Sequence, residues 1–146
     1  MSSLSERRRF ACQCVCWAGL MAALGVLLGS FGAHLMPGFL DAGGGSPEWV
    51  EKRLGQFDVA VRYHLWHAIA LLALPAATTC LSPARLRIVM WLLVLGIVLF
   101  SGSLYLLVLL DASKLGMVTP LGGATWIAAW TLLAVSAFRA LAAPQP

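Results

Sequence analysis

Residues 88–110 read IVMWLLVLGIVLFSGSLYLLVLL, a run without a single charged side chain. A helix of this length, rising about 1.5 Å per residue, spans the hydrocarbon core of a bilayer, which is about 30 Å thick. The rest of the chain has the same character, because 60% of its 146 residues are hydrophobic and only 11% are charged. A soluble globule of this size needs more polar surface than this. The sequence therefore predicts an integral membrane protein.

The charged residues fall in clusters that separate four long neutral runs. Each run has room for the roughly 20 residues that a spanning helix needs. The fourth run is the least hydrophobic because it carries threonine and serine, yet its two tryptophans are typical of membrane helices. The expected fold is an all-α, up-down bundle of four membrane helices that forms a single domain over residues 1–146. We predict its spans near residues 10–36, 59–80, 88–110 and 122–138.

Pairs of a hydroxyl residue and a proline mark three expected helix starts, because the hydroxyl caps the first turn and proline fills a position that needs no amide hydrogen. These pairs are Ser46-Pro47, Ser82-Pro83 and Thr119-Pro120. After the first pair, apolar residues recur on one helical face at Val50, Leu54, Phe57 and Val61. This pattern predicts a short interfacial helix within the loop 37–58, running into the second span. Pro75 inside that span predicts a kink.

The distribution of arginine predicts the orientation, because cytoplasmic loops retain Lys and Arg near the ends of spans. One side of the expected bundle carries Arg7, Arg8, Arg9, Arg85, Arg87 and Arg139. The basic residues of the other side are mixed with acidic ones. We therefore expect a multi-pass protein of the inner membrane with both chain ends in the cytoplasm. The formal net charge of +4 follows from these arginines and requires no nucleic-acid partner.

The first span carries a stripe of small residues whose spacing alternates between four and three. The stripe consists of Ala18, Ala22, Gly25, Gly29 and Gly32. Helices approach one another closely along such a stripe, since dispersion contacts drive their association in lipid. The stripe predicts a tightly packed helix whose partner is either another helix of the chain or a second copy.

The few polar side chains inside the spans are the candidate site, because polar groups are costly in lipid and often functional. They are His34, Arg62, Tyr63, His64, His67, Ser101, Ser103 and Tyr105. His64 and His67 are three residues apart and therefore share a helical face. Arg62 lies above them and can extend toward a lipid phosphate. At about 1.5 Å rise per residue, these histidines and Tyr105 lie roughly 8–12 Å below the outer boundary, so we expect one polar cluster.

Four sequence blocks occur in an order that resembles a known family. The blocks are Gly32-Ala33-His34, Tyr63-His64-x-x-His67-Ala68, Phe100-Ser101-Gly102-Ser103-Leu104-Tyr105 and Thr119-Pro120-Leu121-Gly122-Gly123, with Trp130 later in the last helix. This pattern is similar to domain-of-unknown-function family 423, whose relatives include bacterial inner-membrane proteins and the mitochondrial transmembrane protein 256 group. Arg62 and the long glycine-rich first loop depart from the family pattern. The resemblance implies a multi-helix membrane protein with no established activity.

Three functions stay open on the sequence. In the first, the chain is a packing or accessory protein of a homo-oligomer or larger membrane complex, and its polar side chains satisfy one another's hydrogen bonds. In the second, neutral imidazoles of His34, His64 and His67 ligate a haem iron or a metal ion. In the third, an oligomer transports a proton or small solute with histidine as the titrating group. We expect no enzymatic activity, since no nucleophile stands beside a base.

Overall fold

The computed structural model describes residues 2–142, so residues 1 and 143–146 of the expected domain lie outside the described part of the chain. The regular structure of the described residues is helical, which confirms the predicted all-α class. Two short elements, η1 and η3, are 3₁₀ helices, and η2 is a π-helix. The elements in chain order are α1 (Ser2–His34), α2 (Met36–Ala42), α3 (Pro47–Ala73), η1 (Leu74–Thr79), α4 (Pro83–Gly96), η2 (Ile97–Gly102), α5 (Ser103–Leu109), η3 (Ser113–Met117) and α6 (Thr119–Ala142).

Four helical segments are long and apolar enough to cross a membrane, as the sequence predicts. The third segment, formed by α4, η2 and α5, is the most apolar, with a mean hydropathy of 2.6. The four segments are Leu4–His34, Pro47–Thr79, Pro83–Leu109 and Ser113–Ala142.

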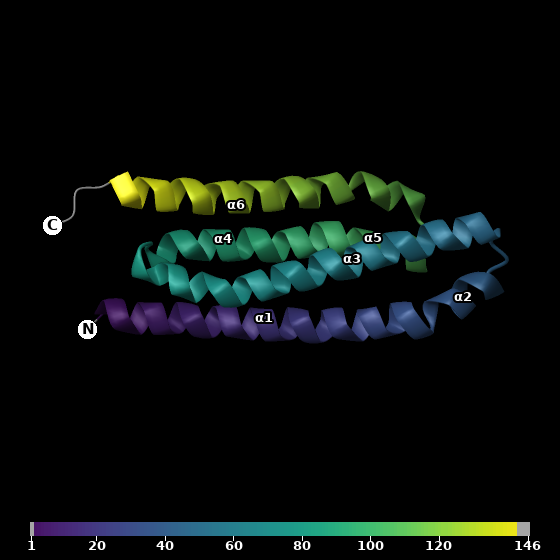
Figure 1. Cartoon of the computed structure of the whole chain (residues 1–146), viewed down its shortest axis with the longest axis horizontal. Helices are drawn as coiled ribbons and strands as arrows, with labels where there is room; N and C mark the ends of the chain where they lie inside the picture. The colour runs from purple at the N-terminus through teal and green to yellow at the C-terminus, as the bar shows by residue number, and fades with distance from the viewer. Residues whose placement is uncertain (1, 143–146) are drawn as a thin grey trace.

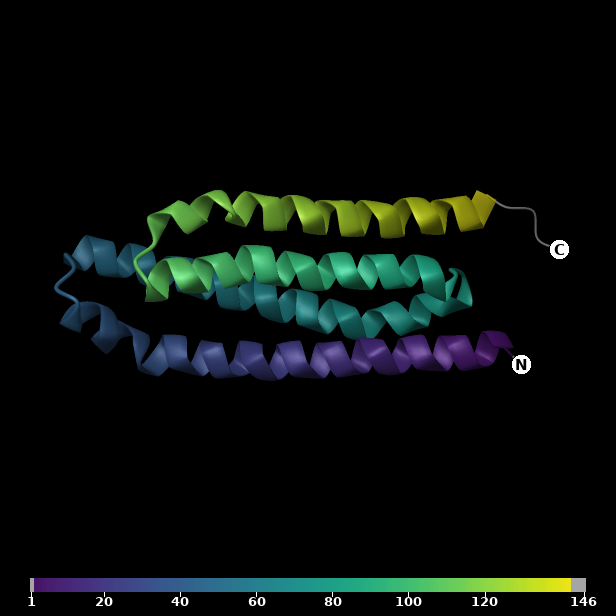
Figure 2. The same ribbon diagram turned by 180° about the vertical axis from the view of Figure 1, so that it is seen from behind.

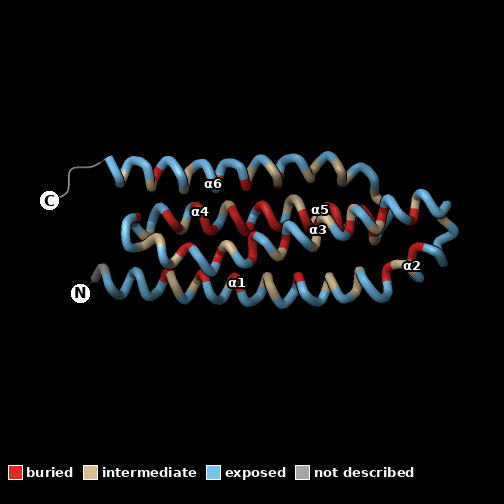
Figure 3. The backbone as a smooth tube through the Cα atoms, viewed as in Figure 1, coloured by how far each residue is buried: buried red, intermediate tan, exposed pale blue. Residues whose placement is uncertain are grey.

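The third segment is the central helix of the bundle. It contacts α1, α3 and α6, and 56% of its most apolar stretch is buried, compared with 17% for the first segment and 22% for the fourth. Figures 1 and 2 show the four segments side by side along a common direction, with the start of α1 and the end of α6 at the same end of the bundle. Buried residues accordingly concentrate along α4 and α5 (Figure 3).

The hydroxyl–proline pairs do mark helix starts, but they differ in how they cap. Ser46 accepts a hydrogen bond from the Trp49 amide at 3.2 Å, and Pro47 opens α3. Ser82 precedes α4 without a capping hydrogen bond from its side chain. Thr119 is itself the first residue of α6 and bonds to another helix instead. Capping by the side chain is therefore found only at Ser46 among these three positions.

The expected interfacial helix is continuous with the second span. Residues 47–58 form the first turns of α3, which runs unbroken to Ala73, because no proline interrupts the segment after Pro47. The expected loop 37–58 also contains α2, which begins at Met36 directly after α1. The charged residues after Ser46 therefore lie on the same helix, α3, as His64 and His67.

Near Pro75, where the sequence predicts a kink, the α-helical part of the second segment ends. Proline has no amide hydrogen to bond the carbonyl four residues earlier. The chain continues beyond Ala73 as the tighter 3₁₀ helix η1. There Thr78 donates its hydroxyl to the Pro75 carbonyl at 2.7 Å, and Thr79 donates to the Ala76 carbonyl at 3.0 Å.

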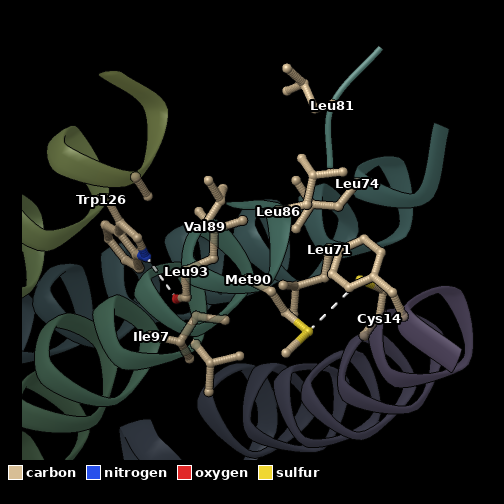
Figure 4. Close-up of a cluster of buried hydrophobic side chains, with 14 residues drawn as sticks. Cys14, Leu71, Leu74, Leu81, Leu86, Val89, Met90, Leu93, Ile97 and Trp126 are labelled. Carbon is tan, nitrogen blue, oxygen red and sulfur yellow. Dashed lines mark hydrogen bonds between the residues drawn. The ribbon is translucent and has the colours of Figure 1, made fainter. Parts of the chain in front are cut away.

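Two apolar cores hold the two ends of the bundle together. In the core nearer the chain ends, Leu71, Leu86 and Leu93 are fully buried (Figure 4). Cys14 of α1 joins them, with its sulfur 3.8 Å from the sulfur of Met90. The second core lies toward the other end and includes Met36, Phe57, Leu104 and Val108. The π-helical turn η2 lies between the two cores, and most of the candidate polar residues lie near it.

Candidate functional site

The small-residue stripe of α1 packs against α3 of the same chain. A Cβ atom added to Gly25 would lie 2.6 Å from the Leu65 side chain, and one added to Gly32 would lie 2.8 Å from the Phe57 ring. Both distances are too short for real contacts, so α3 occupies the space that a larger residue would need. The other members of the stripe are buried or half-buried: Ala18, Ala22 and Gly29.

His64 is a buried link between helices. Its side chain is 1% exposed, and its Nδ1 atom lies 3.2 Å from the Tyr105 hydroxyl of α5. The ring edge also faces Gly25 of α1. Its Nε2 atom forms no hydrogen bond of regular geometry with a described residue, although the Met21 backbone of α1 interacts with the ring. His64 thus joins α3 to α5 and contacts α1.

His67 points toward α6 instead. Its ring stacks on the Trp126 ring with a centroid separation of 3.7 Å and an interplanar angle of 3°. Its Nδ1 atom lies 2.8 Å from the Tyr63 carbonyl, and the Trp130 indole N–H donates to its Nε2 atom at 3.4 Å. The ring is 7% exposed. Together these contacts form an aromatic cluster of Tyr63, His67, Phe100, Trp126 and Trp130.

These hydrogen bonds assign the tautomer of His67. A backbone carbonyl only accepts, so Nδ1 carries the proton and donates to the Tyr63 carbonyl. An indole N–H only donates, so the Nε2 lone pair accepts from Trp130. A metal ion or a haem iron binds through such a lone pair. Coordination at Nε2 would therefore require the bond to Trp130 to break.

The structure corrects the expectation that His34 joins the other two histidines. Gly32 faces α3, and His34 lies two residues later, about 200° around the helix, where it is exposed. Since Gly25 lies level with His64, the nine residues from there to His34 correspond to about 13 Å along α1. Within residues 2–142, no group of three His, Cys, Asp or Glu residues is arranged to hold a metal ion. The haem and metal hypotheses lose their support.

The hydroxyl groups next to η2 serve a separate link between α5 and α6. Ser103 lies 2.9 Å from the Phe100 carbonyl, to which its hydroxyl donates, and 2.8 Å from the Thr119 hydroxyl. Since Ser103 has a single hydroxyl proton, Thr119 is the donor in their shared bond. Ser101 is fully buried, and its hydroxyl oxygen has no hydrogen-bond partner among the described residues. The predicted single cluster is therefore divided into separate contacts.

Arg62 and Tyr63 are exposed residues of α3 and take no part in the contacts of His64. Arg62 forms an ion pair with Asp58 at 3.0 Å, and both side chains are more than half exposed. The Tyr63 ring packs against Phe100, with centroids 5.0 Å apart, and belongs to the aromatic cluster.

Close approach of α6 to the π-helical turn η2 positions the aromatic cluster. Gly122 faces the backbone of Phe100 so closely that a Cβ atom there would overlap it. One turn later the Trp126 indole N–H donates to the Leu93 carbonyl at 3.1 Å (Figure 4). Gly96 leaves room for this indole ring. Single π turns inside α-helices are rare and often lie at functional sites, and here the turn contacts both α3 and α6.

Arg53 is a buried polar residue that sequence reasoning treated as a surface charge. It is 5% exposed, forms an ion pair with Asp111 and donates to Ser113 at 3.0 Å and to the Gln56 amide oxygen at 3.1 Å. Its guanidinium lies 5.3 Å from the centre of the Trp49 ring. The available signal was its position three residues after Val50 and four before Phe57, on the apolar face of the helix. Arg53 thereby ties α3 to the loop before η3.

Comparison with known proteins agrees with this picture of a small membrane protein without a recognised reaction. Residues 28–123 match a family model described as a protein of unknown function, DUF423. The UPF0382 membrane protein YwdK of Bacillus subtilis is 38% identical over 121 residues, covering 82% of this chain and 91% of its own length. The UPF0382 inner membrane protein YgdD of Escherichia coli K12 is 35% identical over 129 residues, covering 84% and 87%. No solved structure shows significant similarity to the chain.

Proposed function

We propose that this chain, which belongs to the DUF423 family of proteins of unknown function, is a multi-pass accessory protein of the inner membrane. Its role in this proposal is to present a rigid helical bundle to a larger membrane complex. The Escherichia coli relative is named an inner membrane protein, which supports the location. The bundle also leaves most of α1 and α6 without cover from the chain itself, so both helices offer faces to lipid and to a partner.

One observation carries the proposal: the polar side chains inside the spans are used for links between helices. His64 bonds Tyr105 across α3 and α5, His67 accepts from Trp130 across α3 and α6, and Ser103 bonds the Thr119 hydroxyl. Such bonds between membrane helices contribute about 0.6 kcal/mol each and up to roughly 1.7 kcal/mol. Groups held in this way stabilise one packing arrangement and are not free to act on a substrate.

The proposal includes an orientation with both chain ends in the cytoplasm. The arginines before residue 10, those at the start of α4 and Arg139 of α6 all belong to the end of the bundle where α1 begins and α6 ends (Figure 1). The Arg53–Asp111 pair belongs to the opposite end. Basic residues near short cytoplasmic loops favour this arrangement over its inverse.

Native electrophoresis of membranes from cells with and without the chain tests the accessory role. We expect one membrane complex to become less abundant, or to migrate faster because it has lost a subunit, when the chain is removed, and to recover when the chain is restored. The purified protein should carry no haem absorbance band and no stoichiometric metal. Unchanged complexes in the deletion strain, together with a chromophore or metal bound to the purified chain, would contradict the proposal.

A further inference from the structure

A groove lies between α3 and the following helices, at the outer half of the bundle in the proposed orientation. It encloses about 590 Å³ and has an apolar floor of Val59, Phe100 and Leu104. Gly55 lies on its α3 wall, and a Cβ atom added there would meet no atom within 4 Å. We call this feature the α3–α5 groove. Its floor suits an acyl chain, since it is apolar.

The rim of the α3–α5 groove carries hydrogen-bond donors for an anion. Lys52 and Arg62 both line it, and Lys52 forms no ion pair with any residue in the described part of the chain. Gln56 also lines it, and its amide oxygen accepts from Arg53. Since an arginine only donates, the Gln56 oxygen faces Arg53, and the amide nitrogen donates to no residue in the described part of the chain.

These donors can meet at one level of the groove. Lys52 lies one turn before Gln56, about 6 Å away along the axis, and Arg62 lies about 9 Å away on the other side. Long basic side chains extend along apolar surface and bring their charged ends to the membrane interface. A phosphate beside Gln56 is thus within reach of two cations and an amide.

Thr119 gives the α3–α5 groove a hydrogen-bond acceptor instead of a donor. Thr119 lines the groove, and its hydroxyl proton is already donated to Ser103. Its remaining lone pairs suit a hydroxyl group of a ligand. The carboxylate in the groove, that of Asp58, is paired with Arg62, so the three charged side chains leave a net positive charge.

We propose that the α3–α5 groove binds an anionic glycerophospholipid, represented by phosphatidylglycerol. Lys52, Gln56 and Arg62 hold the phosphate, and the start of an acyl chain lies on Phe100 and Leu104. The positive charge of the rim complements the phosphate and the apolar floor suits the acyl chain, and both line the same groove. The inference adds a ligand to the accessory protein and does not depend on that role.

Titration of the full-length, delipidated protein in mild detergent, followed by native mass spectrometry, tests the proposal. The probes are phosphatidylglycerol and phosphatidylcholine with identical acyl chains, and inorganic phosphate. We expect one phosphatidylglycerol to bind about tenfold more tightly than phosphatidylcholine, the difference made by a charge-assisted contact. Equal binding of the two lipids, or displacement of phosphatidylglycerol by equimolar inorganic phosphate, would overturn it.

Two variants with a matched control separate the groove from lipid binding elsewhere. Gly55→Leu places a side chain in the groove and should abolish the bound phosphatidylglycerol, whereas Gly19→Leu on α1 should leave it; at both positions an added Cβ atom would meet no atom within 4 Å. Asp58→Asn releases Arg62 from its ion pair and should tighten binding about threefold, within the range of one exposed ion pair. Wild-type binding by Gly55→Leu, or weaker binding by Asp58→Asn, would refute the assignment.

Should Gly55→Leu fail to give a monodisperse helical protein, the double variant Lys52→Gln, Arg62→Gln decides the question. It keeps the shape of the α3 surface and removes both cations. We expect the preference for phosphatidylglycerol over phosphatidylcholine to disappear. A preserved preference would show that the phosphate binds elsewhere.

Discussion

Replacing Gly122 with alanine tests the contact between α6 and the π-helical turn η2. The added Cβ atom would overlap the Phe100 amide nitrogen and would lie 2.7 Å and 2.8 Å from its Cβ and Cα atoms. Since contacts tighter than 3.4 Å are uncommon for a Cβ atom, the two backbones must separate by about 1 Å. The obstacle is backbone, so a side-chain rotation cannot relieve it.

The expected cost has two parts. Forcing a methyl group into a packed contact costs about 1–3 kcal/mol. The shift also strains two bonds that hold α6 in place, from Thr119 to Ser103 and from Trp126 to the Leu93 carbonyl. Each is worth about 0.6 kcal/mol between membrane helices. Helix propensity returns at most about 1 kcal/mol to alanine over glycine. We therefore expect Gly122→Ala to lower the free energy of unfolding by about 1–3 kcal/mol.

Gly123→Ala is the matched control, one residue further along the same helix. Its Cβ atom would lie 3.9 Å from the Phe100 ring, an ordinary van der Waals contact. Only the gain in helix propensity remains, so this variant should be stabilised by up to about 1 kcal/mol. Both free energies of unfolding can be measured by reversible denaturant unfolding in detergent micelles, monitored by tryptophan fluorescence. Equal effects of the two substitutions would refute the close approach of α6 to η2.

Three further outcomes follow from the contacts of single side chains. Tyr105→Phe removes the hydroxyl that bonds His64 and should cost about 0.6–1.7 kcal/mol of unfolding free energy in the same micelle assay; no loss at all would mean that the pair is not formed. Arg53→Met removes a buried guanidinium that pairs with the exposed Asp111 and also bonds Ser113 and Gln56, so it should cost more than Arg62→Met, whose exposed pair is worth about 0.3–0.5 kcal/mol; the reverse order would contradict the buried position of Arg53. A fluorescent protein fused to the C-terminus should be fluorescent and a fused alkaline phosphatase inactive, because that end is cytoplasmic in the proposed orientation, and the opposite pattern would invert it.

Hydropathy and proline placement predict the helices well, because both act within one helix. The neutral runs correspond to the four membrane-spanning segments, and Pro75 marks the change from α3 to η1. Hydropathy predicts the start of the second span less well, since residues 47–58 carry enough charge to resemble a separate interfacial helix. The structure continues α3 through them because nothing after Pro47 interrupts its hydrogen bonds.

The candidate site was predicted less well, because it depends on how each helix is rotated. Depth along the membrane follows from counting residues, and it places His64 near Tyr105 correctly. Depth does not give the direction of a side chain. For that reason the prediction placed His34 in the cluster, although it is exposed and turns away from α3. His67 is directed to α6 by Trp126, whose role could be foreseen only from its position one turn after Gly122. The pairing of Arg53 with Asp111 required the fold of a loop that hydropathy does not describe.

The surplus residue that widens η2 fixes the phase of everything after it. If residues 97–102 bonded as a regular α-helix instead, α5 would be rotated by about 100° and pushed about 1.5 Å along the axis, because the π turn absorbs one residue. Ser103 and Tyr105 would then point away from Thr119 and His64 at once. A deletion in the Gly43–Gly45 connection, by contrast, changes only the span of a loop. The wide bonding of η2 is therefore what aligns α5 with both α3 and α6.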